Sequence, residues 1–338
     1  MFKELLNKVV IGENLKEKEA YWVMNEIMQG KVTTAQIASF LTALRIKGET
    51  VDEITGCARA MRENAISIKN TSPLTVDTCG TGGDYKGTFN ISTVTAFVVA
   101  GAGIKVAKHG NRGVSSRSGS ADVLEELGVN INLTPDKVEK CLEEVGIAFL
   151  FAPVFHPAMR YALEPRREIG FRTIFNLLGP LTNPARVKYQ VLGVYSPELT
   201  EIMAGALHGL GVKNAMVVCG EDGLDEISIG SSTKITWLKD AERETFYLNP
   251  EELGLSRYSL EDIKGGDALI NANIALNILN GDKGPYREIV LVNTAATLVV
   301  CEVVNRMKEG MKMAAHAIDS KAALKKLEAL REYSKRLA

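Results

Sequence analysis

An alternation that starts near Leu74 most constrains the fold of this chain. Short apolar runs alternate there with glycine-rich turns and with segments of helical periodicity; the runs are LTVDTCG, IKVAKHG, IAFLFAP, YQVLGVYS and NAMVVCGE. Strands that are apolar along their whole length are buried on both faces, as in parallel sheets covered by helices. The sequence therefore predicts an α/β fold with a mostly parallel central sheet flanked by helices.

The two ends of the chain differ from this middle part. Residues 1–72 contain no strand-like run and two capping boxes, Thr33 with Gln36 and Thr50 with Glu53, so they predict a small helical domain. The large α/β domain is expected over 73–338. In it, TKITWL and RETFYL predict an antiparallel pair, and the C-terminal part is expected to be chiefly helical. The segment at about 165–185 is expected to add a helix and a hinge to the small domain, with Gly179, Pro180 and Pro184 in its flexible part.

Composition excludes several classes of protein. The chain has 338 residues, with 40 basic and 41 acidic side chains and a net charge of −1, whereas nucleic-acid-binding domains are usually basic. Its five cysteines lie far apart without a CxxC pair, which disfavours disulfides or zinc and indicates a cytoplasmic protein. The charged N-terminus does not resemble a signal peptide. The longest uncharged stretch, 87–104, carries several hydroxyl and amide side chains, so no membrane span is expected.

A glycine-rich loop follows the first predicted strand. Residues 80–84 read GTGGD, and three glycines in four positions allow backbone amides to approach an anion closely. Asn90, Ser92 and Thr93 stand at the start of the next helix, where free N–H groups and the helix dipole favour negative charge. The loop matches neither the dinucleotide fingerprint nor a Walker loop. Alone, it could equally be an ordinary strand-to-helix turn that needs glycine for its backbone angles.

A second polar loop leaves the neighbouring strand at the same end of the sheet. Residues 108–116 read KHGNRGVSS and offer cationic, amide and hydroxyl donors, and the sequence SGS at 118–120 begins a further helix. Singly, His109 could be an ordinary loop histidine and Arg112 a surface ion pair. Together, two such loops on adjacent strands predict a ligand with phosphate at both ends.

Adjacent carboxylates follow another strand. Asp225 and Glu226 lie in the loop GEDGLDEIS, with Glu221 and Asp222 nearby. Paired carboxylates can hold Mg²⁺, which often bridges to substrate phosphates. An exposed pair of surface charges is the alternative interpretation.

These motifs resemble the anthranilate phosphoribosyltransferase family along nearly the whole chain. The resemblance rests on GTGGD, NIST, KHGNRGVSSRSGSADVLEELG, RREIGFRTIFNLLGPLTNPA and the later DE pair. The first of the two long strings is shared in part with pyrimidine-nucleoside phosphorylases, whose own phosphate-loop and nucleoside signatures are not found in this sequence. The resemblance implies that the amine of anthranilate displaces pyrophosphate from C1 of 5-phosphoribosyl-1-pyrophosphate (PRPP), in tryptophan biosynthesis.

The resemblance also implies residue roles. PRPP is expected to contact Gly80, Gly83, Asp84, Thr88, Asn90, Ile91, Ser92, Thr93, Lys108, His109, Gly110, Asn111, Arg112, Gly113, Val114, Ser115, Ser116 and Ser120. Anthranilate is expected to contact Gly80, Asn111 and Arg166, although Arg166 could equally be a helix-surface charge. Two Mg²⁺ ions per subunit are expected at Ser92, Asp225 and Glu226. No general acid or base is expected; Lys108, Asp225 and Glu226 would stabilise the transition state.

The resemblance further implies a homodimer formed through the N-terminal helical domain. An apolar surface too large for so small a domain to bury alone favours the same arrangement. The expected partners are the small molecules PRPP and anthranilate, with no nucleic acid and no membrane. Two alternatives remain, an enzyme like a pyrimidine-nucleoside phosphorylase and a non-catalytic, nucleic-acid-binding relative of the same fold. Ile169, where the family commonly has leucine, is a departure that affects no expected catalytic residue.

Overall fold

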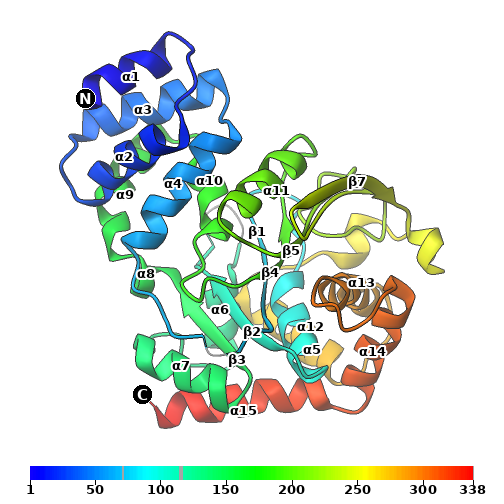
Figure 1. Ribbon diagram of the computed structural model, residues 1–338. Coiled ribbons are helices and arrows are strands. Elements are labelled where there is room, and N and C mark those ends of the chain that lie inside the picture. Colours follow the sequence, from blue (N-terminus) through cyan, green and yellow to red (C-terminus); the bar gives the residue numbers. More distant parts are fainter. Residues whose placement is uncertain (71, 114–116, 338) are drawn as a thin grey trace.

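The computed structural model describes residues 1–70, 72–113 and 117–337 (Figure 1). These residues form a seven-stranded sheet in the order β3-β2-β1-β4-β5-β6-β7. Its strands are β1 (Thr75–Gly80), β2 (Lys105–Gly110), β3 (Ile147–Phe151), β4 (Tyr189–Gly193), β5 (Asn214–Gly220), β6 (Thr233–Lys239) and β7 (Glu242–Leu248). The pairings from β3 to β5 are parallel, and β5–β6 and β6–β7 are antiparallel. The predicted parallel sheet and late antiparallel pair are both confirmed.

Helices surround this sheet and make up the N-terminal and C-terminal parts of the chain. The α-helices are α1 (Phe2–Val10), α2 (Glu17–Met28), α3 (Thr34–Lys47), α4 (Val51–Glu63), α5 (Ile91–Gly101), α6 (Ser120–Glu126), α7 (Pro135–Glu144), α8 (Ala152–Phe155), α9 (Arg160–Ile169), α10 (Phe175–Leu178), α11 (Leu199–Gly209), α12 (Ala268–Leu279), α13 (Pro285–Val300), α14 (Met307–Asp319) and α15 (Ala322–Arg336). Short 3₁₀ helices are η1 (Pro157–Met159), η2 (Gly179–Leu181), η3 (Pro250–Leu253) and η4 (Leu260–Ile263). In the part of the chain that the structure describes, none of these helices is long and apolar enough to cross a bilayer.

The sheet separates two hydrophobic cores. Along β5, Met216 and Val218 face the core that contains α5 and α13, whereas Val217 and Cys219 face a second core that contains α11. Successive strand side chains point to opposite faces, so a strand between two cores must be apolar throughout. This explains why the continuous apolar runs predicted the sheet.

The small helical domain is built from α1 to α4. Both predicted capping boxes are present: the Thr33 hydroxyl accepts from the Gln36 N–H at 3.3 Å, and the Thr50 hydroxyl accepts from the Glu53 N–H at 3.3 Å. The apolar faces of these helices belong to the same core as α9, α10 and α11, so the small domain and one face of the sheet share their interior. In Figure 1, α9 lies beside α2 and α3, and both helices contact it.

Candidate active site

The sheet order places a topological switch point between β1 and β4. From β1 the chain continues through α5 to β2, and from β4 it continues through α11 to β5, on the other side of the switch. Ligands of open α/β sheets bind at the carboxyl ends of strands at such a point. The loops after β1, β2 and β5, in which the sequence predicted phosphate and metal sites, all leave the sheet at this edge.

Two glycines allow the loop after β5 to lie on the ends of β1 and β4. Gly80 and Gly193 are paired across these strands. A Cβ at Gly193 would lie 1.5 Å from the Asp225 carbonyl oxygen, and one at Gly80 would lie 2.4 Å from the Asp225 Oδ2. The Gly82 N–H donates to that Oδ2 at 2.9 Å. The structure thus brings the GTGGD loop and the carboxylate pair together, although they are far apart in the sequence.

The carboxylates of this loop repel one another. Burial and the nearby Asp84 raise the pKa of Asp225 to about 7. Burial and Asp225 raise the pKa of Glu226 well above its ordinary value, while its Oε1 accepts from the Ser92 N–H at 3.1 Å. A cation would relieve this repulsion, so the residues present fit a metal site.

No group of three or more His, Cys, Asp or Glu side chains in the described ranges is arranged to hold a metal by itself. Magnesium is commonly bound through one or two carboxylates together with substrate phosphates and water.

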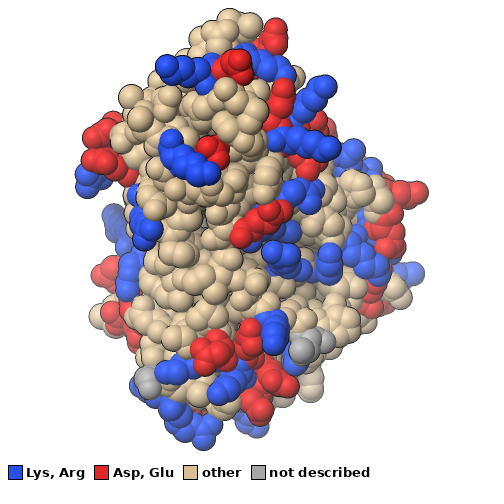
Figure 2. All heavy atoms as spheres, turned by 60° about the vertical axis from the view of Figure 1, so that its left-hand side comes forward, with Lys and Arg blue, Asp and Glu red and all other residues tan. Residues whose placement is uncertain are grey.

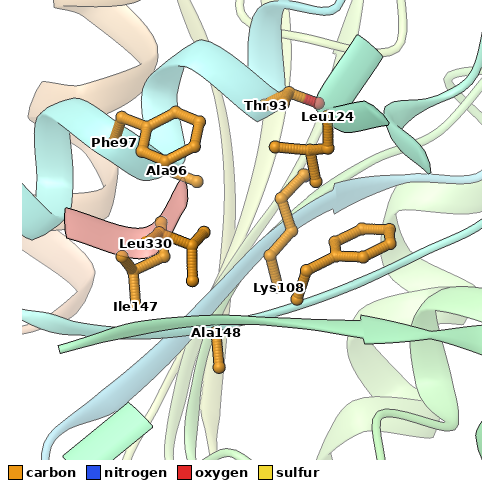
Figure 3. A pocket seen from close by; sticks show the side chains of 9 residues that line it. Thr93, Ala96, Phe97, Lys108, Leu124, Ile147, Ala148 and Leu330 are labelled. Carbon is orange, nitrogen blue, oxygen red and sulfur yellow. The ribbon is translucent and has the colours of Figure 1, made fainter. Parts of the chain in front are cut away.

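Lys108 lies beneath the first turn of α5. Its Nζ donates to the Thr78 carbonyl at 2.5 Å and to the Ser92 hydroxyl at 3.2 Å. Burial lowers the Lys108 pKa, and attraction from Asp77 opposes that shift. Figure 3 shows the Lys108 stem among the apolar side chains between β2 and α5, with Leu124 above it. The ammonium group therefore fixes Ser92 from below.

The start of α5 carries the other expected donor-site residues of the first loop. Asn90 occupies the N-cap position of this helix, and its Nδ2 donates to the Ser118 carbonyl at 3.3 Å instead of its side chain capping the helix. Ile91 and Thr93 are buried, and Thr88 forms an isolated bridge with Lys264. The helix thus starts against the segment that leads to α6, which joins the first loop to the second.

The second loop is folded back on α6. Asp122 accepts from the Gly113 and Gly119 N–H groups at 2.9 and 2.8 Å, and it pairs with Arg112 at 2.9 Å. Glu125 also pairs with Arg112. A Cβ at Gly110 would meet the hydroxyl of Ser120, which donates to the Asn111 carbonyl at 3.4 Å. The expected donor-site residues Val114, Ser115 and Ser116 lie outside the described residues.

His109 points away from the carboxylate pair, toward the segment around η2. Its ring centroid lies 5.1 Å from that of His156. Burial and His156 lower the His109 pKa, and a backbone hydrogen bond with Gly179 opposes that shift. Burial lowers the pKa of His156 to about 4, so both rings are neutral near pH 7. The sequence did not single out His156.

Arg166, the expected anthranilate residue, is half-buried on α9. Its guanidinium lies 5.1 Å from the centroid of Phe175, and burial lowers its pKa. None of the ion pairs found within the described ranges involves Arg166. The desolvated cation therefore favours an anionic ligand such as a carboxylate.

Arg172 links the acceptor side to the glycine-rich loop and was not recognised from the sequence. Its guanidinium donates to the Gly83 carbonyl and lies 4.9 Å from the Tyr85 ring centroid and 4.2 Å from that of Tyr195. Tyr85 has a positive φ of 56°, which is uncommon for an aromatic residue. The only signal in the sequence was the position of Arg172 in the long string FRTIFNLLGPLTNPA.

Comparisons with known proteins cover nearly the whole chain. Residues 3–65 match the model of the glycosyl transferase family helical bundle domain, and residues 72–324 match that of the family's a/b domain. The anthranilate phosphoribosyltransferase of Petrotoga mobilis is 54% identical over 334 residues, which are 99% of this chain and 97% of that protein.

Two solved structures share the whole fold. The anthranilate phosphoribosyltransferase of Thermus thermophilus superposes with a TM-score of 0.93 at 44% identity, covering 98% of this chain and 99% of that one. The Saccharomyces cerevisiae enzyme in complex with PRPP and Mg superposes with a TM-score of 0.91 at 30% identity, covering 99% and 98% of the two chains.

Proposed function

The chain belongs to the anthranilate phosphoribosyltransferase family, and we propose that the residues at the carboxyl ends of β1, β2 and β5 carry out that family's reaction. Members of the family are pentosyltransferases that join the 5-phosphoribosyl group of PRPP to the amine of anthranilate. The nitrogen lone pair forms the bond to C1, the C1–oxygen bond breaks with its electron pair leaving on pyrophosphate, and the nitrogen then releases one proton to solvent. The observation that supports this site most strongly is the contact of the GTGGD loop and Ser92 with Asp225 and Glu226.

PRPP binds, in this proposal, between the GTGGD loop, the start of α5 and the loop after β2. Backbone N–H groups near Gly80 and Gly83 and at the N-terminus of α5 stabilise phosphate charge. Lys108 adds positive charge below Ser92 and holds its hydroxyl in place. The remaining donor-site residues are those expected from the sequence, including Asp84, Thr88, Asn90, Thr93, Asn111 and Ser120.

Magnesium binds at Ser92, Asp225 and Glu226, and we propose two ions per subunit. When bound, magnesium supplies counter-charge to the pyrophosphate. With the cation bound, Asp225 and Glu226 would be its negatively charged ligands, and the Gly82 and Ser92 N–H groups fix the orientation of their carboxyl groups. The relative solved with PRPP and Mg supports the metal identity.

Anthranilate binds between Arg166, Asn111 and Gly80 in this proposal. Arg166 can form a bidentate contact with the ortho carboxylate. No residue acts as a general acid or base; Lys108, Asp225 and Glu226 act on the developing charge of the leaving pyrophosphate, and positioning supplies much of the remaining acceleration.

The reaction is tested by incubating the protein with PRPP, MgCl₂ and anthranilate and measuring pyrophosphate release. A parallel assay measures ribose-phosphate release from thymidine or uridine with inorganic phosphate. Release in the first assay alone is expected, whereas release only in the second would instead assign a nucleoside phosphorylase.

We also propose that the chain works as a cytoplasmic homodimer. In addition, we propose that residues 171–184 form a hinge that links the small helical domain (1–72) to the rest of the large α/β domain (73–338). On the face drawn in Figure 2, basic and acidic side chains are interspersed, which argues against a nucleic-acid-binding surface there. Different interdomain angles in free and doubly liganded crystals would support the hinge; identical angles would contradict it.

A further inference from the structure

Two buried asparagines in the C-terminal helices contact the backbone and side chains that form the site. Asn271 on α12 and Asn293 on α13 are 3% and 1% exposed. Both helices follow the last site residue in the sequence, and no role in the reaction is expected for either helix. The side-chain amide of Asn293 contacts the loop after β5, and that of Asn271 contacts the start of α5.

Asn293 holds the residue that follows the carboxylate pair. Its Oδ1 accepts from the Ile227 N–H at 3.0 Å, and its Nδ2 donates to the Ile227 carbonyl at 3.1 Å. The same Nδ2 donates to the Ile289 carbonyl of its own helix at 2.9 Å. This double contact satisfies both backbone groups of Ile227, as a neighbouring strand would, and so fixes the chain directly after Glu226.

Asn271 holds the start of α5. Its Oδ1 accepts from the Gly266 N–H at 2.8 Å, and its Nδ2 donates to the Gly266 carbonyl at 3.4 Å. That Nδ2 donates to the Asn90 Oδ1 at 2.9 Å and to the Ser118 hydroxyl at 2.8 Å. The orientation of the Asn90 amide follows, since only its oxygen can accept from Asn271. Asn271 thereby ties the first phosphate loop to the second.

We propose that Asn293 and Asn271 are positioning residues of the transfer reaction, Asn293 for the metal-binding carboxylates and Asn271 for the PRPP loops. This inference rests on the proposed roles of Glu226 and Asn90. A buried polar group without a hydrogen-bond partner costs free energy. Loss of either side-chain amide should therefore allow the segment that it contacts to shift, which is the loop after β5 for Asn293 and the start of α5 for Asn271. Partners that orient a metal-binding group typically change metal affinity or activity by about 10–100-fold when removed.

The test compares Asn293→Ala, Asn271→Ala and Asn214→Ala. Asn214 is a matched control because it is 1% exposed and accepts from the Trp237 indole N–H at 2.7 Å, but it begins β5 at the opposite end of the sheet. Binding of PRPP is measured by calorimetry with varied MgCl₂, together with the KM of each substrate and the thermal unfolding midpoint.

Asn293→Ala is expected to raise the MgCl₂ concentration needed for PRPP binding by about tenfold or more. Asn271→Ala is expected to weaken PRPP binding by a similar factor at every MgCl₂ concentration, with the KM for anthranilate unchanged. Asn214→Ala should lower only the unfolding midpoint. The proposal is wrong if the first two variants behave like Asn214→Ala.

Hydrogen exchange at Ile227 and the MgCl₂ dependence of Glu226→Gln provide two further tests. If an alanine variant does not fold, hydrogen exchange of the unmodified protein tests the contact of Asn293 with Ile227. An Ile227 N–H held by Asn293 should exchange only through global unfolding. Fast local exchange of that N–H would contradict the proposal. Glu226→Gln tests the underlying metal role. If Glu226→Gln leaves the MgCl₂ dependence unchanged, the proposed function fails; if it shifts that dependence and Asn293→Ala does not, only this inference fails.

Discussion

At the scale of single residues, the two sides of the site carry unmatched charges of opposite sign. Asp225 and Glu226 are carboxylates whose pKa values are raised by burial and by repulsion, and Arg166 is a half-buried guanidinium whose pKa is lowered by burial. Each charge is poorly compensated by the protein, so each favours an oppositely charged ligand. Different substitutions should therefore affect different ligands.

Arg166→Ala should weaken anthranilate selectively. A charge-assisted hydrogen bond contributes about 1.5–3 kcal/mol, so the KM for anthranilate should rise roughly ten- to a hundredfold. If the contact is equal in the ground and transition states, kcat should change little. Steady-state kinetics with each substrate varied in turn measures this, with Arg167→Ala as control because Arg167 is exposed on the same helix. An unchanged KM for anthranilate would place the acceptor site elsewhere.

Replacement of the carboxylates should instead affect the metal and the leaving group. We expect Asp225→Ala and Glu226→Ala to reduce kcat severely and to shift the MgCl₂ dependence, because pyrophosphate loses its counter-charge. Loss of one group that stabilises developing charge typically costs about 10²–10³-fold in kcat, and we expect a loss of this order when a metal ligand is removed. Glu221→Ala, at an exposed carboxylate of the same loop, should retain normal kinetics. An unaltered MgCl₂ dependence in both site variants would contradict this assignment.

At the scale of elements, Arg172 couples the end of α9 to the loop after β1. The helix ends at Gly170, which is left-handed with a φ of 67°, and two residues later Arg172 reaches the Gly83 carbonyl between Tyr85 and Tyr195. The loop that is proposed to bind PRPP is therefore held by the segment that follows the proposed anthranilate residue. A movement of the hinge segment would therefore also move the loop that is proposed to bind PRPP.

We expect Arg172→Ala to raise the KM for PRPP by about tenfold or more, since two stacking contacts and a charge-assisted hydrogen bond are lost. Hydrogen exchange in residues 81–87 should also become faster. Arg172→Lys keeps the charge but loses the planar face, so its KM should be intermediate. Arg160→Ala removes a comparable arginine stacked 4.8 Å from the Tyr161 centroid and should leave both readouts unchanged. Identical exchange in all variants would show that Arg172 does not hold the loop.

The helices, strands and loops differ in how far they could be predicted from the sequence. The strands and loops were predictable because their signals are local, such as apolar runs that end in glycine and the capping boxes at Thr33 and Thr50. Asn271 and Asn293 were not, because each lies inside an apolar helical segment and gains its role only through tertiary packing. A helix from about 165–185 was expected beside the small domain, but the sequence did not predict that α11 and one face of the sheet belong to the same core.

At the scale of the whole molecule, apolar side chains are exposed at the ends of two helices of the small domain. Val10 and Ile11 at the end of α1 and Ile46 near the end of α3 are 61%, 63% and 82% exposed. The Lys47 Nζ at the end of α3 donates to the Asn14 Oδ1 just after α1 at 2.9 Å, so these helix ends lie close together. A second copy of the chain would cover such a surface.

Light scattering at micromolar protein should therefore give about twice the chain mass of 36.7 kDa. Ile46→Glu should shift the mass toward the monomer, because a charge would be buried at the interface. Tyr247→Glu alters a 53% exposed side chain on the distant edge strand β7 and should leave the dimer intact. A monomeric mass for the unmodified protein would exclude a dimer at this concentration.

The pH dependence of global stability should report the neutral His156 beside His109. The pKa of His156 falls from 6.5 to about 4 on folding because the ring is buried. The unfolded chain therefore takes up a proton near pH 6.5, whereas the folded protein does not until about pH 4. The contribution of His156 to stability is complete above pH 6.5 and is lost as pH falls toward 4, by up to roughly 3 kcal/mol at 1.36 kcal/mol per pKa unit.

Urea unfolding at a series of pH values isolates this term as a difference: as pH falls from 6.5 to 4, the free energy of unfolding of His156→Gln should rise relative to that of the unmodified protein, by up to roughly 3 kcal/mol. The variant keeps the part due to His109, whose pKa is also lowered by burial. Asp77, Asp225 and Glu226 act in the opposite direction, because burial raises their pKa values, to about 6 for Asp77 and to about 7 for Asp225. The contribution of these carboxyls falls as pH rises, and it is common to both proteins, so it cancels in the difference. His208→Gln, at an exposed ring on α11, should retain the full slope. Equal slopes in His156→Gln and His208→Gln would show that His156 is not held neutral by the fold.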